Sequence, residues 1–390
     1  MRDKNNLLKL FAVCAPGLEP FTAQEMAHLG LEPHPSAEFG DNSEVEENGG
    51  VEFCGTLDDV WRANLQLRTA SRILVRLGEF YTTTFSELRK KASQLSWESY
   101  IKPGQPVSIR VTCHKSRLYH SDGVAERVAG AIFDRLIKPS PVIKAKDETF
   151  PDKTQLVVVR FYRDFCTISI DSSGELLHRR GYRLETAKAP LRETLAAGLI
   201  IASGWDGIAP LIDPFCGSGT IPIEAALIAG HTWPGEKRKF AFMDWPGYST
   251  GTLSKIMSAN KTIPPVDFPL IIASDRDAGA IQIAQSNARR AGLSNQIQLS
   301  CQAVSAIKPL AAKGWIVTNP PYGVRVSANK DLRNLYAQFG NVLRLKCPDW
   351  HFAILCSEPA LLHQTGLHFQ DMLLFKNGGI KVRLAIGMVD

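Results

Sequence analysis

The stretch LIDPFCGSGT, residues 211–220, decides the fold class of this 390-residue chain. It begins in an apolar strand predicted over 210–212, passes through a turn with Gly217 and Gly219, and leads into a helix predicted over 221–229. Glycine lets the backbone approach a ligand where any Cβ atom would clash. The stretch therefore predicts a strand, a ligand-binding turn and a helix, although an ordinary strand–helix turn is the alternative interpretation.

Three further apolar strands are predicted on the C-terminal side of this turn, over 270–273, 315–318 and 352–356, and helices separate them. Fully apolar strands that alternate with helices are typical of a parallel sheet covered on both faces. Ligands of such sheets bind beyond the carboxyl ends of the strands. We therefore expect the chemistry at Asp213, Asp275 and Asn319, which stand at the ends of three of these strands.

The residues around the glycine turn favour a cationic ligand over a phosphate. A dinucleotide-binding turn of the GxGxxG type would place its third glycine at 222, where this chain has Pro222. A P-loop requires Gly-Lys followed by Ser or Thr, which is absent here. Asp213 directly precedes the turn and would repel phosphate, whereas it suits a sulfonium that carries an amino group.

A second acidic strand end lies at SDRD, residues 274–277. A carboxylate offers two acceptor oxygens, so we predict that Asp275 binds both hydroxyls of a ribose. Asp277 is predicted to cap the helix over 278–290. The acid usually follows the glycines by about 20 residues, and the greater distance here indicates an inserted loop over 231–268.

The third motif is TNPPYG, residues 318–323. Proline lacks an N–H group and fixes the backbone, so the side-chain oxygen of Asn319 and the carbonyl of Pro320 can accept both hydrogens of an exocyclic amine. Tyr322 would offer an aromatic face to a base. The alternative is a rigid Pro-Pro turn with a tyrosine that only packs.

DPFCGSGT together with TNPPYG resembles the class I S-adenosylmethionine-dependent amino-methyltransferases. With GELLHRRGYR (174–183), APLRETLAAGLI (189–200) and SGW (203–205), the chain resembles the bacterial THUMP-domain RNA methyltransferases that make N2-methylguanosine in large-subunit ribosomal RNA. GLEP (17–20) and ASRILVRL (70–77) are weaker matches to the same family.

This resemblance implies an α/β fold, in which a Rossmann-like, doubly wound methyltransferase sheet follows two α+β units. The implied boundaries are a ferredoxin-like unit over 1–80, a THUMP RNA-binding domain over 81–172 and a class I methyltransferase domain over 173–390. It also implies S-adenosylmethionine as the cofactor and structured RNA, either 23S rRNA or its precursor, as the partner.

Individual roles follow from the same resemblance. The residues expected to bind the cofactor are Asp213, Phe215, Gly217, Ser218, Gly219, Asp275, Glu193 and Thr194. The residues expected to hold the target base are Asn319, Pro320, Pro321 and Tyr322. The chain departs from the family at Ala303, where an Asp usually contacts the adenine amino group, so that contact would fall to the backbone or to Gln302.

Basic residues are concentrated in the middle of the chain. The whole chain carries a net charge of +6. The segment from Arg110 to Arg192 contains sixteen basic and ten acidic residues, so its own net charge is also +6. Positive charge interleaved with aromatic residues, as near Phe240, Phe242 and Trp245, fits RNA, although a solvated surface would explain each cluster alone. The predicted RNA contacts are Lys115, Arg117, Arg179, Arg180, Arg183, Lys237 and Arg238.

Composition excludes several other classes of protein. A hydrophobic content of 44% and a charged content of 22% exclude wholesale disorder. No apolar run is long enough to span a membrane, and Lys9 breaks the first apolar run, so we expect neither a membrane helix nor a secretory signal. The eight cysteines are scattered singly without metal-ligand spacing. We therefore expect a cytoplasmic protein without a metal.

Taken together, the sequence predicts an RNA guanine-N2 methyltransferase, and two alternatives stay open. An N6-adenine methyltransferase acting on DNA or RNA would use the same amine-binding turn. A non-catalytic RNA-binding assembly factor would explain Ala303. Cys216 suggests a nucleophilic thiol, as in pyrimidine C5 methylation, but it lies inside the glycine turn instead of beside the predicted base site.

Overall fold

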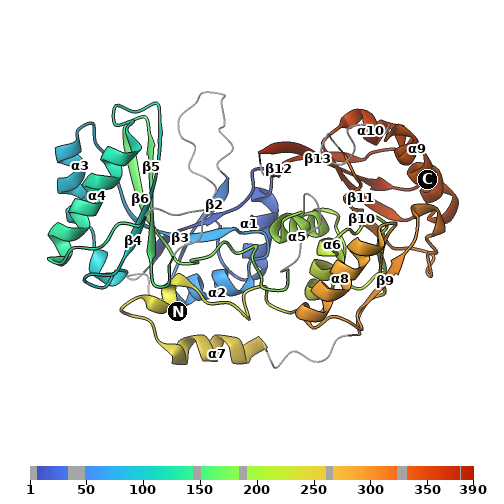
Figure 1. The fold of residues 1–390 in the computed structure, drawn as a ribbon, viewed down its shortest axis with the longest axis horizontal. Helices are drawn as coiled ribbons and strands as arrows, with labels where there is room; N and C mark the ends of the chain where they lie inside the picture. The colour runs from blue at the N-terminus through green and yellow to red at the C-terminus, as the bar shows by residue number, and fades with distance from the viewer. Residues whose placement is uncertain are drawn as a thin grey trace.

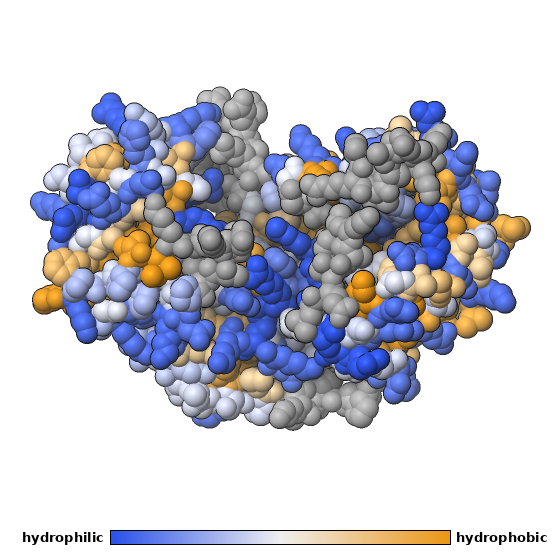
Figure 2. Space-filling model, viewed as in Figure 1, coloured by the Kyte–Doolittle hydropathy of each residue, from blue (hydrophilic) through white to orange (hydrophobic). Residues whose placement is uncertain are grey.

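The computed structural model describes residues 7–33, 49–143, 151–183, 191–260, 267–322, 332–377 and 379–390. The described residues form two β-sheets, one of six strands and one of seven, which lie in two lobes (Figure 1). Figure 2 shows mostly hydrophilic side chains on the coloured surface between the lobes. Within these ranges, no helix is long and apolar enough to cross a membrane.

The N-terminal sheet has the strand order β2-β1-β3-β6-β5-β4. Its strands pair antiparallel except for β4 and β5, which are parallel. The strands are β1 (Leu8–Val13), β2 (Gly50–Gly55), β3 (Arg72–Tyr81), β4 (Val107–His114), β5 (Gln155–Tyr162) and β6 (Phe165–Asp171). The helices that accompany them are α1 (Glu19–His28), α2 (Leu57–Gln66), α3 (Phe85–Ser93) and α4 (Ser121–Leu136). Because β3 pairs with β6, the first two predicted units share one continuous sheet.

Local sequence signals explain these elements. Thr56 and Asp59 form a capping box at the start of α2, and Thr84 caps α3 through the N–H of Glu87. In β5, alternate residues point to opposite faces, so Val157, Val159 and Phe161 are buried while the residues between them are partly exposed. Helices α3 and α4 cover the buried face.

The C-terminal sheet has the strand order β12-β13-β11-β10-β7-β8-β9. The five strands from β11 to β9 are parallel, and β13 is antiparallel to β11. The strands are β7 (Leu211–Asp213), β8 (Ile271–Asp275), β9 (Ile297–Cys301), β10 (Trp315–Thr318), β11 (His351–Cys356), β12 (Asp371–Asn377) and β13 (Ile380–Met388). The strand order reverses between β7 and β10, and a crevice for ligands forms at such a point.

Helices cover both faces of the C-terminal sheet, as the apolar strands predict. One hydrophobic core joins the sheet to α5 (Glu193–Ala202), α6 (Thr220–Ala229) and α8 (Ala278–Ala291). A second core on the opposite face joins it to α9 (Arg333–Lys346) and α10 (Pro359–Gln364).

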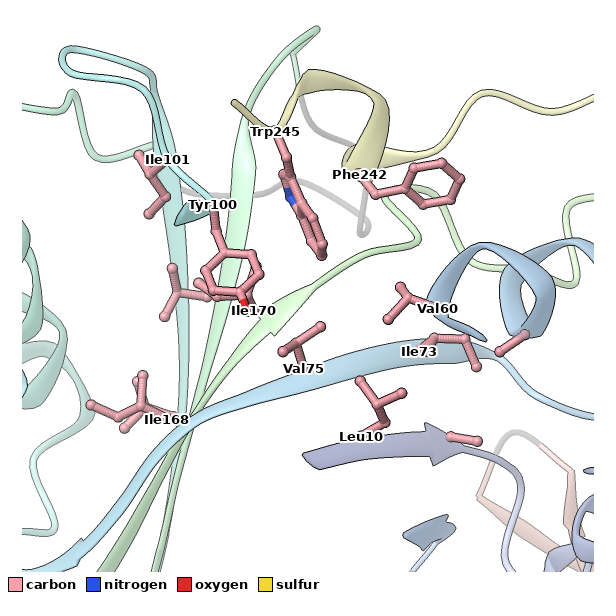
Figure 3. Close-up of a cluster of buried hydrophobic side chains, with 14 of the residues drawn as sticks. Leu10, Val60, Ile73, Val75, Tyr100, Ile101, Ile168, Ile170, Phe242 and Trp245 are labelled. Atoms are coloured by element: carbon pink, nitrogen blue, oxygen red, sulfur yellow. The ribbon is translucent and has the colours of Figure 1, made fainter. Parts of the chain in front are cut away.

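The inserted segment after α6 packs on the N-terminal sheet. It contains a short 3-10 helix, η3 (Ala241–Asp244), and α7 (Thr250–Asn260). The ring centroids of Phe242 and Trp61 are 4.1 Å apart. The indole N–H of Trp245 donates a 2.9 Å hydrogen bond to the side-chain oxygen of Gln155. Trp245 points toward Val75 and Ile170 of the N-terminal sheet (Figure 3), and Phe242 belongs to the same buried hydrophobic cluster. The prediction that Phe240, Phe242 and Trp245 flank an RNA surface is therefore wrong, because all three are buried.

The two lobes are also joined directly. Arg68, after α2, donates hydrogen bonds to the carbonyls of Leu227 and Thr232 at 3.2 and 2.8 Å. Leu18 of the N-terminal lobe packs so closely on α5 that a Cβ atom at Gly198 would lie 2.5 Å from it. These contacts and the inserted segment fix the N-terminal sheet to the C-terminal domain.

Candidate active site

The glycine turn leads from β7 to α6, as predicted. Gly217 and Gly219 have φ angles of +51° and +83°, in the region that favours glycine. A Cβ atom at Gly219 would lie 3.0 Å from Ala284, whereas one at Gly217 would meet no atom within 4 Å among the described residues. Gly217 thus borders open space, and Pro222 is accommodated because it lies in the first turn of α6.

Asp213 is buried at the end of β7 and links the two predicted motifs. Its Oδ1 atom accepts hydrogen bonds from the hydroxyl of Thr318 at 2.6 Å and from the N–H of Phe215 at 3.2 Å. Burial raises the pKa of Asp213 to about 7. Thr318 ends β10 and directly precedes Asn319, so the glycine turn and the proline turn lie at the same edge of the sheet.

Asp275 closes the other side of the glycine turn. Its Oδ2 atom accepts a 3.0 Å hydrogen bond from the N–H of Gly217, and its Oδ1 atom accepts one from Asp277. The side chain of Asp277 accepts from the N–H groups of Gly279 and Ala280, which confirms its predicted role as a helix cap. Asp275 therefore lies beside the turn.

Asn287 on α8 also supports the turn, a role that the motifs at the strand ends do not predict. Its Nδ2 atom donates a 3.0 Å hydrogen bond to the carbonyl of Ser218. Both residues are buried. Asn287 shares the buried face of α8 with Ala280 and Ala284, so the sequence signal is an amide among the apolar positions of the helix predicted over 278–290, because buried polar groups need partners.

The proline turn presents an acceptor without a donor. The Oδ1 atom of Asn319 is buried and has no hydrogen-bond partner among the described residues. Leaving such an acceptor unpaired costs about 1–3 kcal/mol. Pro320 is buried, and the hydroxyl of Tyr336 lies 3.3 Å from the carbonyl of Pro321. This turn is thus held in place while one acceptor stays available for an amine.

Each of the two turns carries an aromatic side chain, Phe215 in the glycine turn and Tyr322 in the proline turn. Tyr322 is partly buried and packs beside both cores of the C-terminal sheet. The ring centroids of Phe215 and of Phe339 on α9 are 5.2 Å apart, and the two rings form an edge-to-face contact. Phe215 therefore packs against the core with at least part of its ring.

Glu193 and Thr194 start α5 and are both buried. Glu193 forms a 2.9 Å ion pair with Arg183, and burial raises the pKa of Glu193 to about 7. Because α5 packs against α6, which begins at the glycine turn, Glu193 lies on a helix that neighbours the turn. Its role toward a cofactor stays a prediction.

Three of the predicted RNA contacts are structural instead. Arg180 is 5% exposed, forms a 3.1 Å ion pair with Glu224 and donates a 2.6 Å hydrogen bond to the carbonyl of Arg68. Arg183 is held by Glu193 and donates to the carbonyl of Leu191. Arg238 donates to the carbonyls of Glu175, Leu176 and Arg179. Their guanidinium groups are committed inside the protein, so these three predictions are corrected.

The other predicted RNA contacts stay accessible. Lys115, Arg117 and Lys237 are exposed. Arg179 is partly exposed, and its guanidinium lies 3.9 Å from the carboxylate of Glu175. Lys115 and Arg117 follow β4, whereas Lys237 belongs to the inserted segment.

The surroundings of Cys216 do not favour a nucleophilic thiol. Cys216 is buried in the glycine turn, and burial raises its pKa well above the usual value. A nucleophilic cysteine requires the opposite shift. Among the described residues, no group of three or more His, Cys, Asp or Glu side chains is arranged to hold a metal ion.

Three family models match the chain. Residues 180–389 match a model described as "RMKL-like, methyltransferase domain", residues 9–74 match "RlmL ferredoxin-like domain", and residues 82–171 match "THUMP domain". The first of these covers more than half of the chain.

Curated relatives carry related names. "Putative RNA methyltransferase YpsC" of Bacillus subtilis is 36% identical over 85% of this chain and 83% of its own. "Ribosomal RNA large subunit methyltransferase K/L" of Methylococcus capsulatus is 33% identical over 96% of this chain and 50% of its own. The chain thus spans about half the length of the K/L relatives it matches.

Two solved structures are similar along almost the whole chain. "Crystal structure of SMU.472, a putative methyltransferase complexed with SAH" has a TM-score of 0.86 at 29% identity and covers 99% of both chains. A "predicted N6-adenine-specific DNA methylase" from Listeria monocytogenes has a TM-score of 0.86 at 32% identity and covers 99% of this chain and 97% of its own. These matches establish the Rossmann-like C-terminal fold that follows ferredoxin-like and THUMP units.

Proposed function

Because the chain belongs to the family of RMKL-like methyltransferases, we propose that it transfers a methyl group from S-adenosylmethionine to the exocyclic N2 amine of a guanosine in 23S rRNA. The observation that carries this proposal is the buried Oδ1 atom of Asn319, which has no partner among the described residues. An amine hydrogen would satisfy it. Thr318, which directly precedes Asn319, donates a hydrogen bond to Asp213 and so connects the proline turn to the glycine turn.

The residues of the glycine turn fit a sulfonium cofactor with an amino group. S-adenosylmethionine, when bound, supplies a methyl group on a cationic sulfur. Asp213, Phe215, Gly217, Ser218 and Gly219 would hold its methionine part, and the open space beside Gly217 leaves room for it. A positive charge near Asp213 would favour the ionised carboxylate, which burial alone disfavours.

The remaining cofactor contacts come from neighbouring elements. Asp275 would accept hydrogen bonds from the ribose, and Glu193 and Thr194 would close the pocket from α5. The backbone near Ala303 or the side chain of Gln302 would contact the adenine, and the N–H of Gln302 is already fixed by the carbonyl of Asp275.

The proline turn would orient the target amine without a strong base. The side chain of Asn319 and the carbonyl of Pro320 would accept its two hydrogens, Pro321 would keep the turn rigid, and Tyr322 would stack on the base. Orientation of this kind can remove about 7–11 kcal/mol of the barrier. Both acceptors would bind more strongly as positive charge develops on the nitrogen.

The matched THUMP range and the exposed Lys115, Arg117 and Lys237 support RNA as the partner. We further propose that the chain divides into units at 1–80, 81–172 and 173–390. Each of the three matched ranges, 9–74, 82–171 and 180–389, lies within one of these units, which supports this division.

An N6-adenine methyltransferase is the second candidate function. The acceptors of the proline turn bind an exocyclic amine without selecting the base that carries it. The similar structure from Listeria monocytogenes is named for N6-adenine methylation of DNA. A non-catalytic assembly factor is the third candidate, and it rests on Ala303 alone.

One experiment separates these functions. The purified chain is incubated with methyl-labelled S-adenosylmethionine and either unmodified 23S rRNA or duplex DNA, and the nucleosides are then analysed. We expect label in N2-methylguanosine from RNA. Label in N6-methyladenosine from RNA, or in N6-methyl-2′-deoxyadenosine from DNA, would replace the proposal with the second candidate. The absence of both product and cofactor binding would replace it with the third.

A further inference from the structure

Four aromatic side chains form a row across one end of the N-terminal sheet. Tyr81 of β3 lies opposite Phe165 of β6, Phe165 lies opposite Tyr162 of β5, and Tyr162 lies opposite His114 of β4. Residues directly opposite each other on paired strands point to the same face of a sheet. The four rings therefore stand side by side on one face and span four strands.

This face is the one that the helices leave uncovered. Phe161 and Cys166, the chain neighbours of Tyr162 and Phe165, are fully buried in the core beneath α3 and α4. Alternation along each strand places Tyr162 and Phe165 on the opposite face. Tyr81 is 65% exposed, His114 is exposed, and Tyr162 and Phe165 are partly exposed.

The rings are arranged in two contacting pairs. The ring centroids of His114 and Tyr162 are 5.7 Å apart with only 3° between the ring planes. Those of Tyr81 and Phe165 are 4.8 Å apart in an edge-to-face contact. The row thus offers aromatic surface that is already ordered by its own contacts.

Positive charge surrounds the same end of the sheet. Lys115 and Arg117 follow His114, and both are exposed. Arg163 is exposed in the turn between β5 and β6, and its guanidinium lies 5.2 Å from the ring centroid of Tyr162. Arg160, two residues before Tyr162, points to the same face. This charge complements a polyanion that crosses the row.

The backbone holds two of these cations in an unfavourable conformation. Arg163 and Asp164 have φ angles of +50° and +64° in a two-residue hairpin turn, where Asn-Gly is the preferred sequence. Lys115 has a φ angle of +49°. Residues other than glycine are strained at such φ angles, and strained backbone of this kind is often found at functional sites.

We propose that this aromatic row is a platform on which unpaired nucleotides of an RNA strand stack, with Lys115, Arg117 and Arg163 along the phosphates. The proposal rests on the proposed function for its partner, RNA, but not for methyl transfer. Aromatic side chains on an open sheet face stack bases that are splayed out of a helix, and a duplex cannot present its base faces in this way.

The test compares single-stranded and duplex RNA. The full chain is titrated, by fluorescence anisotropy, into an unstructured oligoribonucleotide of about 10–12 nucleotides and into the corresponding blunt duplex. The test variant combines Tyr81→Ala with Tyr162→Ala, and Tyr81→Phe with Tyr162→Phe keeps the rings. The matched control is Phe133→Ala, which removes a 43% exposed ring from α4 on the helical side of the same unit.

We expect the double alanine variant to bind the single strand about tenfold or more weakly, while duplex binding and the affinity for S-adenosylmethionine stay at the wild-type level. The phenylalanine variant and Phe133→Ala should bind like the wild type. The proposal would be overturned if the wild type and the double alanine variant bound the single strand equally well. It would also be overturned if the wild type did not bind the single strand, or if the double alanine variant lost duplex binding to the same extent as single-strand binding. Ring-dependent binding without any methyl transfer would instead overturn the proposed function and leave the platform standing.

Discussion

The hydroxyl of Thr318 donates a 2.6 Å hydrogen bond to the buried carboxyl of Asp213. This bond links β7, which leads into the glycine turn, to β10, which carries Asn319 into the proline turn. The two strands are neighbours at the point where the strand order of the sheet reverses. The proposed cofactor site and the proposed base site therefore share one polar contact, and a change at either residue should affect both.

Replacing Thr318 with valine tests this link. Thr318→Val keeps the shape of the side chain but removes the donor, and the loss raises the pKa of Asp213 further because that hydrogen bond lowers it. We expect the affinity for S-adenosylmethionine at neutral pH to fall about tenfold, measured by calorimetry. Thr318→Ser keeps the hydroxyl and should bind almost normally. Unchanged affinity in Thr318→Val would show that the link does not matter for the cofactor.

The affinity for the cofactor should depend on pH through Asp213. Burial raises the pKa of this carboxyl to about 7, so its ionised fraction falls as the pH drops below that value. A cationic ligand binds the ionised form better. We therefore expect calorimetry to show weaker binding of S-adenosylmethionine as the pH falls through 7, and Asp213→Asn to bind weakly without this dependence.

Two further groups bear on that pH profile. Asp275 acts on Asp213 through its charge, and Glu193 has a pKa of about 7 on the neighbouring helix. Glu193→Gln is therefore the control and should retain the dependence. A wild-type affinity that is constant through pH 7, or a dependence that Glu193→Gln abolishes, would assign the effect elsewhere.

Arg180 should matter for stability and not for RNA binding. Arg180→Ala leaves the fully buried carboxylate of Glu224 without its cation, and breaking such a pair costs about 3–5 kcal/mol. We expect a loss of this size in the free energy of unfolding, measured with urea. Arg179→Ala removes a partly exposed partner of Glu175 and should cost less than about 1 kcal/mol. Normal stability combined with weaker RNA binding in Arg180→Ala would instead show that Arg180 contacts RNA.

The inserted segment should behave as part of the core of the N-terminal sheet. Trp245 is 3% exposed, and its ring centroid lies 4.8 Å from that of Tyr100 in an edge-to-face contact. Its indole N–H donates a hydrogen bond to Gln155. Trp245→Ala should therefore destabilise the protein by about 3–5 kcal/mol, measured by urea unfolding. Lys237→Ala, an exposed change in the same segment, should stay within about 0.5 kcal/mol. Equal stability of the two variants would contradict the packing described.

The sequence predicts the strand ends because their geometry is local. Asp213, Asp275 and Asn319 each terminate an apolar strand, and parallel strands bring their carboxyl ends to one edge of the sheet. The cap at Asp277 is predictable for the same reason, since it depends on residues two and three positions away. Alternating apolar strands and helices also suffice to predict a parallel sheet covered on both faces.

What the sequence cannot predict depends on distant partners. Aromatic and basic residues around Phe242 have the same pattern in an RNA surface and in a docked segment, and only the packing on Trp61 decides between them. Arg180 is buried because Glu224, far along the chain, pairs with it. The aromatic row from Tyr81 to His114 depends on the register of four strands, which the local pattern does not set.

A substitution at Asn319 tests whether one site presents the target amine to the cofactor. Single-turnover methyl transfer to 23S rRNA is measured for the wild type and for Asn319→Ala, and the dissociation constants for S-adenosylmethionine and RNA are determined for both. We predict that the variant transfers the methyl group about a hundredfold more slowly or worse, while both dissociation constants stay at the wild-type values. Transfer by Asn319→Ala at the wild-type rate would show that Asn319 does not hold the target amine.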